Sequence, residues 1–220
     1  MAIAGTQRLQ NMKTKFAPLF VLVASLLAAA QLQAESLVDG SAEAGKAKSL
    51  TCSACHRAAG NSVNPLWPNT AGQHAKYVVT QLQAFKSGER MDPLMTSQAM
   101  LLNEQDMADL AVYFEGLPGA VQAVANPELV DRGESLYRGG NLEKGVAACL
   151  GCHGPTGRGN AAAEYPSLQG QHAAYTAKQL EDYASGARKT GGKTQIMQSI
   201  AGRLSKEDIK ALASYVQGLR

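Results

Sequence analysis

After residue 34 the chain lacks both a long apolar run and an excess of charge of either sign. No later segment offers the roughly 20 apolar residues that a spanning helix needs, so we expect the mature protein to be soluble. The first 34 residues carry three basic and no acidic side chains, which leaves 18 of each sign in the remainder. A nucleic-acid-binding protein would show a basic excess, and that class is therefore excluded.

Acidic residues are missing from the first 34 positions, and the residues present there form the pattern of a secretory signal. Three basic residues precede an apolar run over 17–30, and a stretch of small residues ends at Ala34. These features are typical of a signal peptide. We expect residues 1–34 to be removed on export, with cleavage after Ala34 and with Ala30 as a second candidate. The alternative is a membrane anchor over residues 16–34, whose ends Pro18 and Gln31 interrupt.

Short-period repeats are absent, but the chain contains one long duplication. The segment AGQHAKYVVTQLQAFKSGER (71–90) matches QGQHAAYTAKQLEDYASGAR (169–188), and LNEQDMADLAVYFEGL (102–117) matches LSKEDIKALASYVQGL (204–219). A period of this length indicates a duplicated domain and not a solenoid. We therefore predict an N-terminal domain over 35–116, a linker over 117–129 with Pro and Gly punctuation, and a C-terminal domain over 130–220.

Strand signals are weak, and each copy is expected to be all-α. The closing segments place apolar residues at i, i+3, i+4 and i+7, which is one face of a helix. Asn103 and Ser205 are suitable N-caps, each with an acidic residue three positions later, and Gly116 and Gly218 fit the helix ends. A second amphipathic helix is expected within 71–90 and 169–188, and a short helix before each cysteine pair.

Cysteine is scarce, and none lies outside two short motifs. The four cysteines form Cys52-Ser-Ala-Cys55-His56 and Cys149-Leu-Gly-Cys152-His153. This motif attaches haem covalently: the two thiols add to the haem vinyl groups and the histidine ligates iron. Disulfides, a structural zinc site and a redox-active pair are the alternatives. Zinc leaves the histidine unexplained in both copies, and a thioredoxin-like pair would need a βαβ context.

Aromatic residues make up only 5% of the chain, and each copy is small for a self-sufficient apolar core. A large, flat, apolar cofactor inside each copy would supply the missing core. We therefore expect two haem c groups, attached through Cys52 and Cys55 in the first copy and through Cys149 and Cys152 in the second. His56 and His153 are the expected iron ligands.

The second axial ligand is expected to be methionine. The C-terminal domain contains a single methionine, Met197, which lies eight residues before the N-cap of its closing helix. The same offset in the first copy selects Met95. Met107 falls on the apolar helix face and is expected to be core, while Met91 and Met100 have no methionine counterpart and are interpreted as loop or packing residues.

Two further pairs repeat and could contact the cofactor. His74 and His172, in Gly-Gln-His, are alternative sixth ligands, but a helix-terminal histidine that meets solvent or a haem propionate is the simpler interpretation. Arg90 and Arg188 could pair with propionates or lie solvated on the surface.

The order of motifs resembles a known family. Cys-x-x-Cys-His, then P-x-x-x-G-Q at Pro68 or Pro166, a helix, a methionine loop and a closing helix resemble the class I cytochrome c fold. Two such units, with YPSLQGQHAAYTAKQL and SYVQGL in the second, are similar to the dihaem cytochrome c4 family over residues 41–220. The fold class implied is all-α, with two tandem class I cytochrome c-like domains that each wrap around one covalent haem.

The resemblance implies a soluble periplasmic electron carrier without enzymatic activity. Its donor would be a quinol-oxidising complex and its acceptor a terminal oxidase, with peripheral contact to such membrane complexes. It also implies that the carbonyls of Pro68 and Pro166 accept the N–H of the ligating histidines, and that the haems lie within tunnelling reach. Leucine, as at Leu168 in the second copy, is the usual residue of the family at the position of Thr70. The polar threonine therefore leaves open whether the first haem pocket excludes water as fully as the second.

Charge is divided unequally between the copies. Residues 35–118 carry a net charge of −3 and residues 119–220 a net charge of +3. We expect this asymmetry to orient the molecule toward a different partner at each end, which is a salt-sensitive effect on association rates. The rival functions are a dihaem peroxidase, which needs an accessible or His-ligated iron, and an oxidase subunit tethered by residues 16–34.

Overall fold

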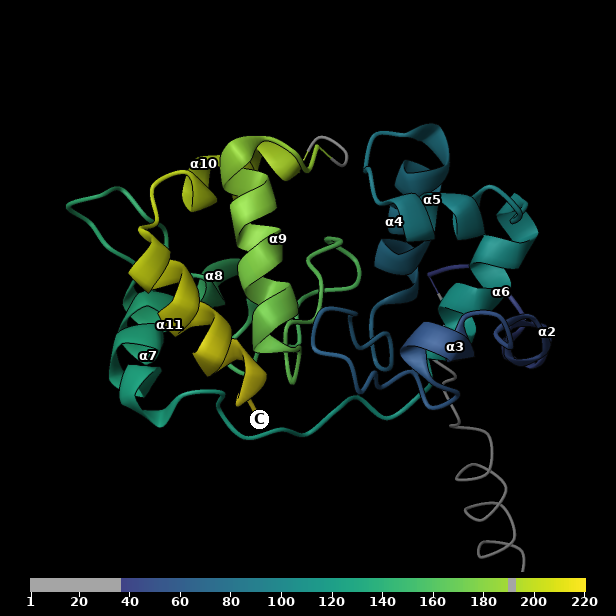
Figure 1. Cartoon of the computed structure of the whole chain (residues 1–220), viewed down its shortest axis with the longest axis horizontal. Coiled ribbons are helices and arrows are strands. Elements are labelled where there is room, and N and C mark those ends of the chain that lie inside the picture. The colour runs from purple at the N-terminus through teal and green to yellow at the C-terminus, as the bar shows by residue number, and fades with distance from the viewer. Residues whose placement is uncertain (1–36, 190–192) are drawn as a thin grey trace, which may run out of the picture. The chain divides into compact units, whose positions relative to one another are not determined.

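The structure is a computed structural model that describes residues 37–189 and 193–220 (Figure 1). The signal peptide over 1–34, its cleavage after Ala34 and the alternative anchor over 16–34 fall outside the described residues. Among the described residues, no helix is long and apolar enough to cross a membrane.

In the described part of the chain, the regular elements are helices joined by loops, with a few isolated β-bridges. The helices occur in the same order twice. The prediction of an all-α fold is confirmed. The first set is α2 (Ala42–Lys48), α3 (Ser53–His56), α4 (Ala75–Ser87), α5 (Pro93–Ala99) and α6 (Glu104–Glu115). The second set follows the 3-10 turn η1 (Pro127–Leu129) and is α7 (Val130–Gly139), α8 (Leu150–His153), α9 (Ala173–Ser185), α10 (Thr194–Ala201) and α11 (Lys206–Gln217).

The closing helices begin at the N-caps that the sequence predicts. Asn103 and Ser205 each accept a hydrogen bond from the backbone N–H three residues later, and Asp106 and Asp208 bond back to the cap N–H, so both are complete capping boxes. Gly116 and Gly218 end α6 and α11, as expected, but with negative φ values of −74° and −90°.

The first and last helices of each copy cross at a glycine. A Cβ atom at Gly45 would lie 2.1 Å from the carbonyl oxygen of Asp109, and one at Gly133 would lie 2.4 Å from that of Ala211. Because no side chain larger than hydrogen fits there, α2 packs directly on the backbone of α6 and α7 on that of α11. This pair of glycines was not predicted from the sequence.

Each copy has its own apolar core. In the C-terminal copy the cluster comprises Leu136, Tyr137, Leu212, Tyr215, Val216 and Leu219. The fully buried Tyr137 donates its hydroxyl hydrogen to the carbonyl oxygen of Gly154 at 2.6 Å, which satisfies its polar end. In the N-terminal copy Met107 is 1% exposed, so its prediction as a core residue is confirmed, whereas Met91 and Met100 are exposed.

The segments that carry the candidate methionine ligands are helices, and their prediction as loops is wrong. Met95 lies in α5, where Asp92 accepts hydrogen bonds from the N–H groups of Leu94 and Met95 and Pro93 occupies the first turn. These are a strong N-cap and a favoured first residue, and together they support a helix of only two turns. Met197 occupies the equivalent α10.

Candidate functional site

A cavity of about 920 Å³ is lined by residues of both copies. Its walls are formed largely by apolar side chains, as is usual for ligand sites, and include Trp67, Leu82, Phe85, Leu168 and Leu180. Seven of the eight predicted haem residues also line it: Cys55, His56, Met95, Cys149, Cys152, His153 and Met197. The eighth, Cys52, is the N-cap of α3, one turn from Cys55.

The four motif cysteines are partly buried, and the structure places no disulfide between them. Burial raises the pKa of the Cys52 thiol, and it raises the pKa of Cys149 to about 11. Thiols with a raised pKa are protonated at neutral pH. In the described part of the chain, no three His, Cys, Asp or Glu side chains converge on a metal site of their own.

The motif histidines are buried and held in one orientation. The Nδ1 atom of His56 lies 2.9 Å from the carbonyl oxygen of Pro68, and that of His153 lies 3.0 Å from the carbonyl oxygen of Pro166. These are the hydrogen bonds that the family resemblance implies. Burial lowers the pKa of both imidazoles, although the bond to the proline carbonyl opposes this. Each ring is therefore neutral, with its proton on Nδ1, and the Nε2 lone pair remains to bind a metal.

The two candidate methionines lie at equivalent positions of the two copies, in α5 and α10. Met95 and Met197 are partly buried and line the cavity that His56 and His153 line. Met91 also reaches this cavity, but it is 84% exposed. Each copy thus brings an imidazole, a thioether and at least one motif thiol to the apolar walls, and the first copy's other thiol, Cys52, lies one turn away. These groups fit a covalently attached haem.

The histidines of the two Gly-Gln-His motifs each form a hydrogen bond with the backbone of the other copy. The Nε2 atom of His74 lies 2.7 Å from the carbonyl oxygen of Arg158, and that of His172 lies 2.9 Å from the carbonyl oxygen of Ser62. Neither histidine is among the residues that line the cavity. His172 is buried, so its interpretation as a solvent contact is wrong.

The glutamines of the same motifs form a reciprocal clamp. The side-chain amide of Gln171 accepts from the N–H of Asn69 at 2.8 Å and donates to its carbonyl oxygen at 2.9 Å. Gln73 makes the same two bonds to Ser167, both at 2.9 Å. This role of the glutamines was not predicted from the sequence, although the exact repetition of Gly-Gln-His was a signal that could have revealed it.

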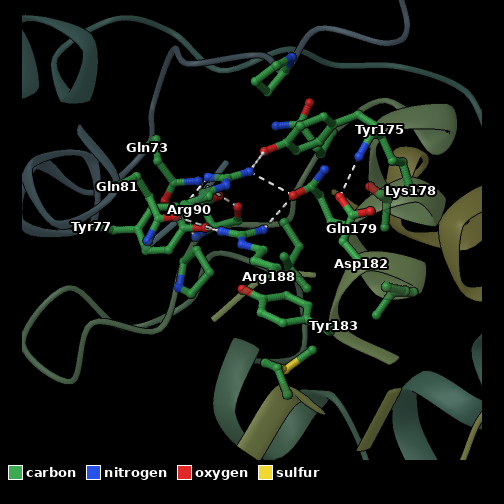
Figure 2. Close-up of a pocket in the computed structure, with 18 of the residues that line it drawn as sticks. Gln73, Tyr77, Gln81, Arg90, Tyr175, Lys178, Gln179, Asp182, Tyr183 and Arg188 are labelled. Atoms are coloured by element: carbon green, nitrogen blue, oxygen red, sulfur yellow. Dashed lines mark hydrogen bonds and ion pairs between the residues drawn. The ribbon is translucent and has the colours of Figure 1, made fainter. Parts of the chain in front are cut away.

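The repeated arginines also meet between the copies. Arg90 and Arg188 form an isolated antiparallel bridge and both are buried, so their interpretation as solvated surface residues is wrong. Figure 2 shows the two guanidinium groups surrounded by the tyrosines and glutamines of α4 and α9. These partners are Tyr77, Gln81, Tyr175 and Gln179.

Thr70 occupies the position that Leu168 fills in the second copy, and both line the cavity. The Thr70 hydroxyl donates to the carbonyl oxygen of Gly60 at 3.3 Å. Its polar atom therefore has a backbone partner and does not require water in the first pocket.

Comparison with known proteins places these sites in a family. The cytochrome c family model matches residues 42–118 and 130–220. The chain is 47% identical to cytochrome c4 of Pseudomonas aeruginosa over 198 residues, covering 90% of this chain and 98% of that protein.

A solved structure and a more distant relative extend the comparison. The crystal structure of reduced recombinant cytochrome c4 from Pseudomonas stutzeri superposes with a TM-score of 0.79 at 46% identity, covering 82% of this chain and all of that one. A thiosulfate dehydrogenase electron acceptor from Stutzerimonas stutzeri is 32% identical and covers 76% of this chain and 77% of that protein. The chain belongs to the cytochrome c4 family of dihaem electron carriers, with two cytochrome c domains and cysteines for two covalently attached haem groups.

Proposed function

We propose that the protein carries electrons in the periplasm between a quinol-oxidising complex and terminal oxidases, using two methionine-histidine haems. The observation that carries this proposal is the double constellation of thiols, imidazole and thioether around one cavity. Because one cavity is lined by both sets of residues, an electron that a donor delivers to one haem would have a path within the molecule to the other.

Each copy is proposed to bind one haem. Cys52 and Cys55 would hold the first haem, and His56 and Met95 would ligate its iron. Cys149 and Cys152 would hold the second haem, and His153 and Met197 would ligate its iron. When bound, each haem supplies a one-electron iron couple, and histidine–methionine ligation gives such a couple a high potential suited to electron transfer.

The chain's own groups keep these ligands in position. The carbonyls of Pro68 and Pro166 hold the Nδ1 protons of His56 and His153, so the ring orientation does not depend on the charge of the iron. The buried tyrosine Tyr137 and the apolar walls exclude water from the second site. A carrier needs such rigidity, because it must not rearrange when an electron arrives or leaves.

Partners are proposed from charge and from the relatives. The opposite net charges of residues 35–118 and 119–220 would orient the protein at two different docking surfaces. The distant relative named as a thiosulfate dehydrogenase electron acceptor supports the idea that proteins of this kind accept electrons from other redox proteins. Export with removal of residues 1–34 would give a mature N-terminus at Glu35.

A ligand test uses the protein isolated from a periplasmic fraction. We expect two haems per chain by pyridine haemochrome assay, a mature N-terminus at Glu35, and a far-red methionine–iron absorbance band at two-haem intensity. Met95→Ala and Met197→Ala should each remove half of this band, while Met100→Ala at an exposed site should leave it unchanged.

The same measurement separates the rival assignments. Loss of half the band in Met91→Ala, and not in Met95→Ala, would move the first ligand to the other methionine that lines the cavity. A wild-type band at one-haem intensity, with peroxidase turnover, would reject the carrier in favour of a dihaem peroxidase. A membrane-bound protein that retains residues 1–34 would indicate the tethered oxidase subunit.

A further inference from the structure

Two arginines meet at the place where the cavity passes from one copy to the other. Arg90 is 8% exposed and Arg188 is 4% exposed, and both line the cavity. Arg90 donates to Gln81 of its own copy at 2.7 Å and to Tyr175 and Gln179 of the other at 3.0 and 2.7 Å. Arg188 mirrors this, with bonds to Gln179 at 2.8 Å, Tyr77 at 2.6 Å and Gln81 at 2.8 Å.

The hydrogen-bonding partners of this arginine pair are all neutral. Neither guanidinium has a carboxylate within ion-pair distance in the described part of the chain. The carboxylate of Asp182, seen beside the cluster in Figure 2, is paired with Lys178 at 2.5 Å. Two like charges buried side by side are costly unless negative charge is brought to them.

Two further observations are consistent with an anion that binds beside Arg90 and Arg188. The Nε atom of Arg188 is buried and has no hydrogen-bond partner, which is rare for a native polar group. Burial by itself would raise the pKa of the Tyr175 phenol, but the nearby charges of Arg90 and Arg188 outweigh it and lower the pKa below its ordinary value. The site therefore has both a free donor and a positive potential.

We infer that the arginine pair is a shared electrostatic partner for the propionate carboxylates of both haems, and that it sets the reduction potentials of the two centres together. This inference rests on the proposed function, because it requires a haem in each half of the cavity. Positive charge favours the reduced form of the iron, which carries one positive charge less. Each arginine is also held by a tyrosine and a glutamine of the other copy, so docking of the copies maintains the potential of both haems.

The test is a spectroelectrochemical redox titration of the holoprotein that resolves both haem transitions. Arg90→Gln and Arg188→Gln each remove one charge and keep a polar side chain. We expect each single variant to lower the reduction equilibrium constant of both haems by about tenfold, the effect of one unit charge on another about 12 Å away at an effective dielectric constant of about 20. Tenfold corresponds to about 59 mV for a one-electron couple.

Control variants separate charge from structure. Arg138→Gln, at an exposed arginine paired with Glu134, should leave both potentials unchanged. Arg90→Lys and Arg188→Lys keep the charge but lose the fork of donors, and should stay within about twofold of wild type. A tenfold fall in the lysine variants would overturn the electrostatic interpretation, even if a glutamine variant failed to fold.

The pattern across the two transitions decides whether the pair is shared. The inference would be overturned if each variant shifted the reduction potential of only one haem, or of neither haem. Haem content and the far-red band are recorded on every variant. One haem per chain, or no methionine band, in the wild-type protein would reject the proposed function itself, whereas two normal haems with unaltered potentials in the glutamine variants would reject only this inference.

Discussion

The interface between the copies can be tested through a single side chain, Gln171. Its amide makes both a donated and an accepted hydrogen bond to the backbone of Asn69, at 2.9 and 2.8 Å, and both residues are buried. In Gln171→Ala, the N–H and the carbonyl oxygen of Asn69 lose their partners inside the interface. A backbone group left unsatisfied in a buried position costs about 1–3 kcal/mol, so we expect the variant to lose about 2–4 kcal/mol of the free energy of unfolding.

The assay is guanidinium-induced unfolding of the holoprotein, followed by far-ultraviolet circular dichroism. Limited proteolysis at the exposed linker around Val121 gives a second measurement, because undocked copies should be cleaved faster. Gln83→Ala, at an exposed position of α4, is the control for loss of a glutamine. Gln73→Ala removes the equivalent bonds to Ser167 at a less buried position and should cost less than Gln171→Ala.

Ordinary surface substitutions change the free energy of unfolding by less than about 0.5 kcal/mol. If Gln171→Ala lies within this range of the Gln83→Ala control, Gln171 does not stabilise the interface. An unchanged rate of linker cleavage in a clearly destabilised variant would place the loss within one copy and not at the interface.

Three further predictions concern packing, pH and salt. Gly133→Ala should destabilise the protein by about 2–3 kcal/mol or more, because its Cβ would lie 2.4 Å from a backbone oxygen. The matched Gly139→Ala in the same helix meets nothing within 4 Å and should stabilise by about 0.5–1 kcal/mol; equal thermal midpoints for the two would contradict the helix crossing. The ammonium group of Lys48 lowers the pKa of Asp109 to about 2. Its contribution to stability is therefore present above pH 3.8, the ordinary value, and is lost as pH falls through the folded pKa, so acid titration of Asp109→Asn should show a weaker loss across that interval. Finally, electron-transfer rates with natural partners should fall as ionic strength rises; rates independent of salt would exclude steering by the charge asymmetry of the copies.

Some predicted features were confirmed because they depend on neighbours in the sequence. The capping boxes at Asn103 and Ser205 need only a cap and an acidic residue three positions later. The short helix α5 also had a local sequence signal, an N-cap at Asp92 followed by Pro93. This signal was not used, because a loop was expected around Met95. The assignment of Met95 as a ligand stays a prediction, supported by its position beside the cavity.

Other features failed because they depend on packing between distant segments. Arg188 is polar and borders a glycine-rich segment, which fits a surface position, yet it is buried against Tyr77, a residue 111 positions away. His172 is buried for the same reason, through its contact with Ser62. Helical periodicity describes one face of one helix and contains no information on which other helix will cover it.

The sequence by itself determined the chemistry: two covalent attachment motifs, a duplicated all-α domain, and a proposed set of axial ligands equivalent in both copies. Local spacing and the repeat were sufficient, because thioether attachment and capping act over a few residues. Only the tertiary structure decided what the other repeated residues do. Gln73, Gln171 and the arginine pair act across the interface, since a repeat places identical residues on both copies but only docking brings them within hydrogen-bonding distance of each other.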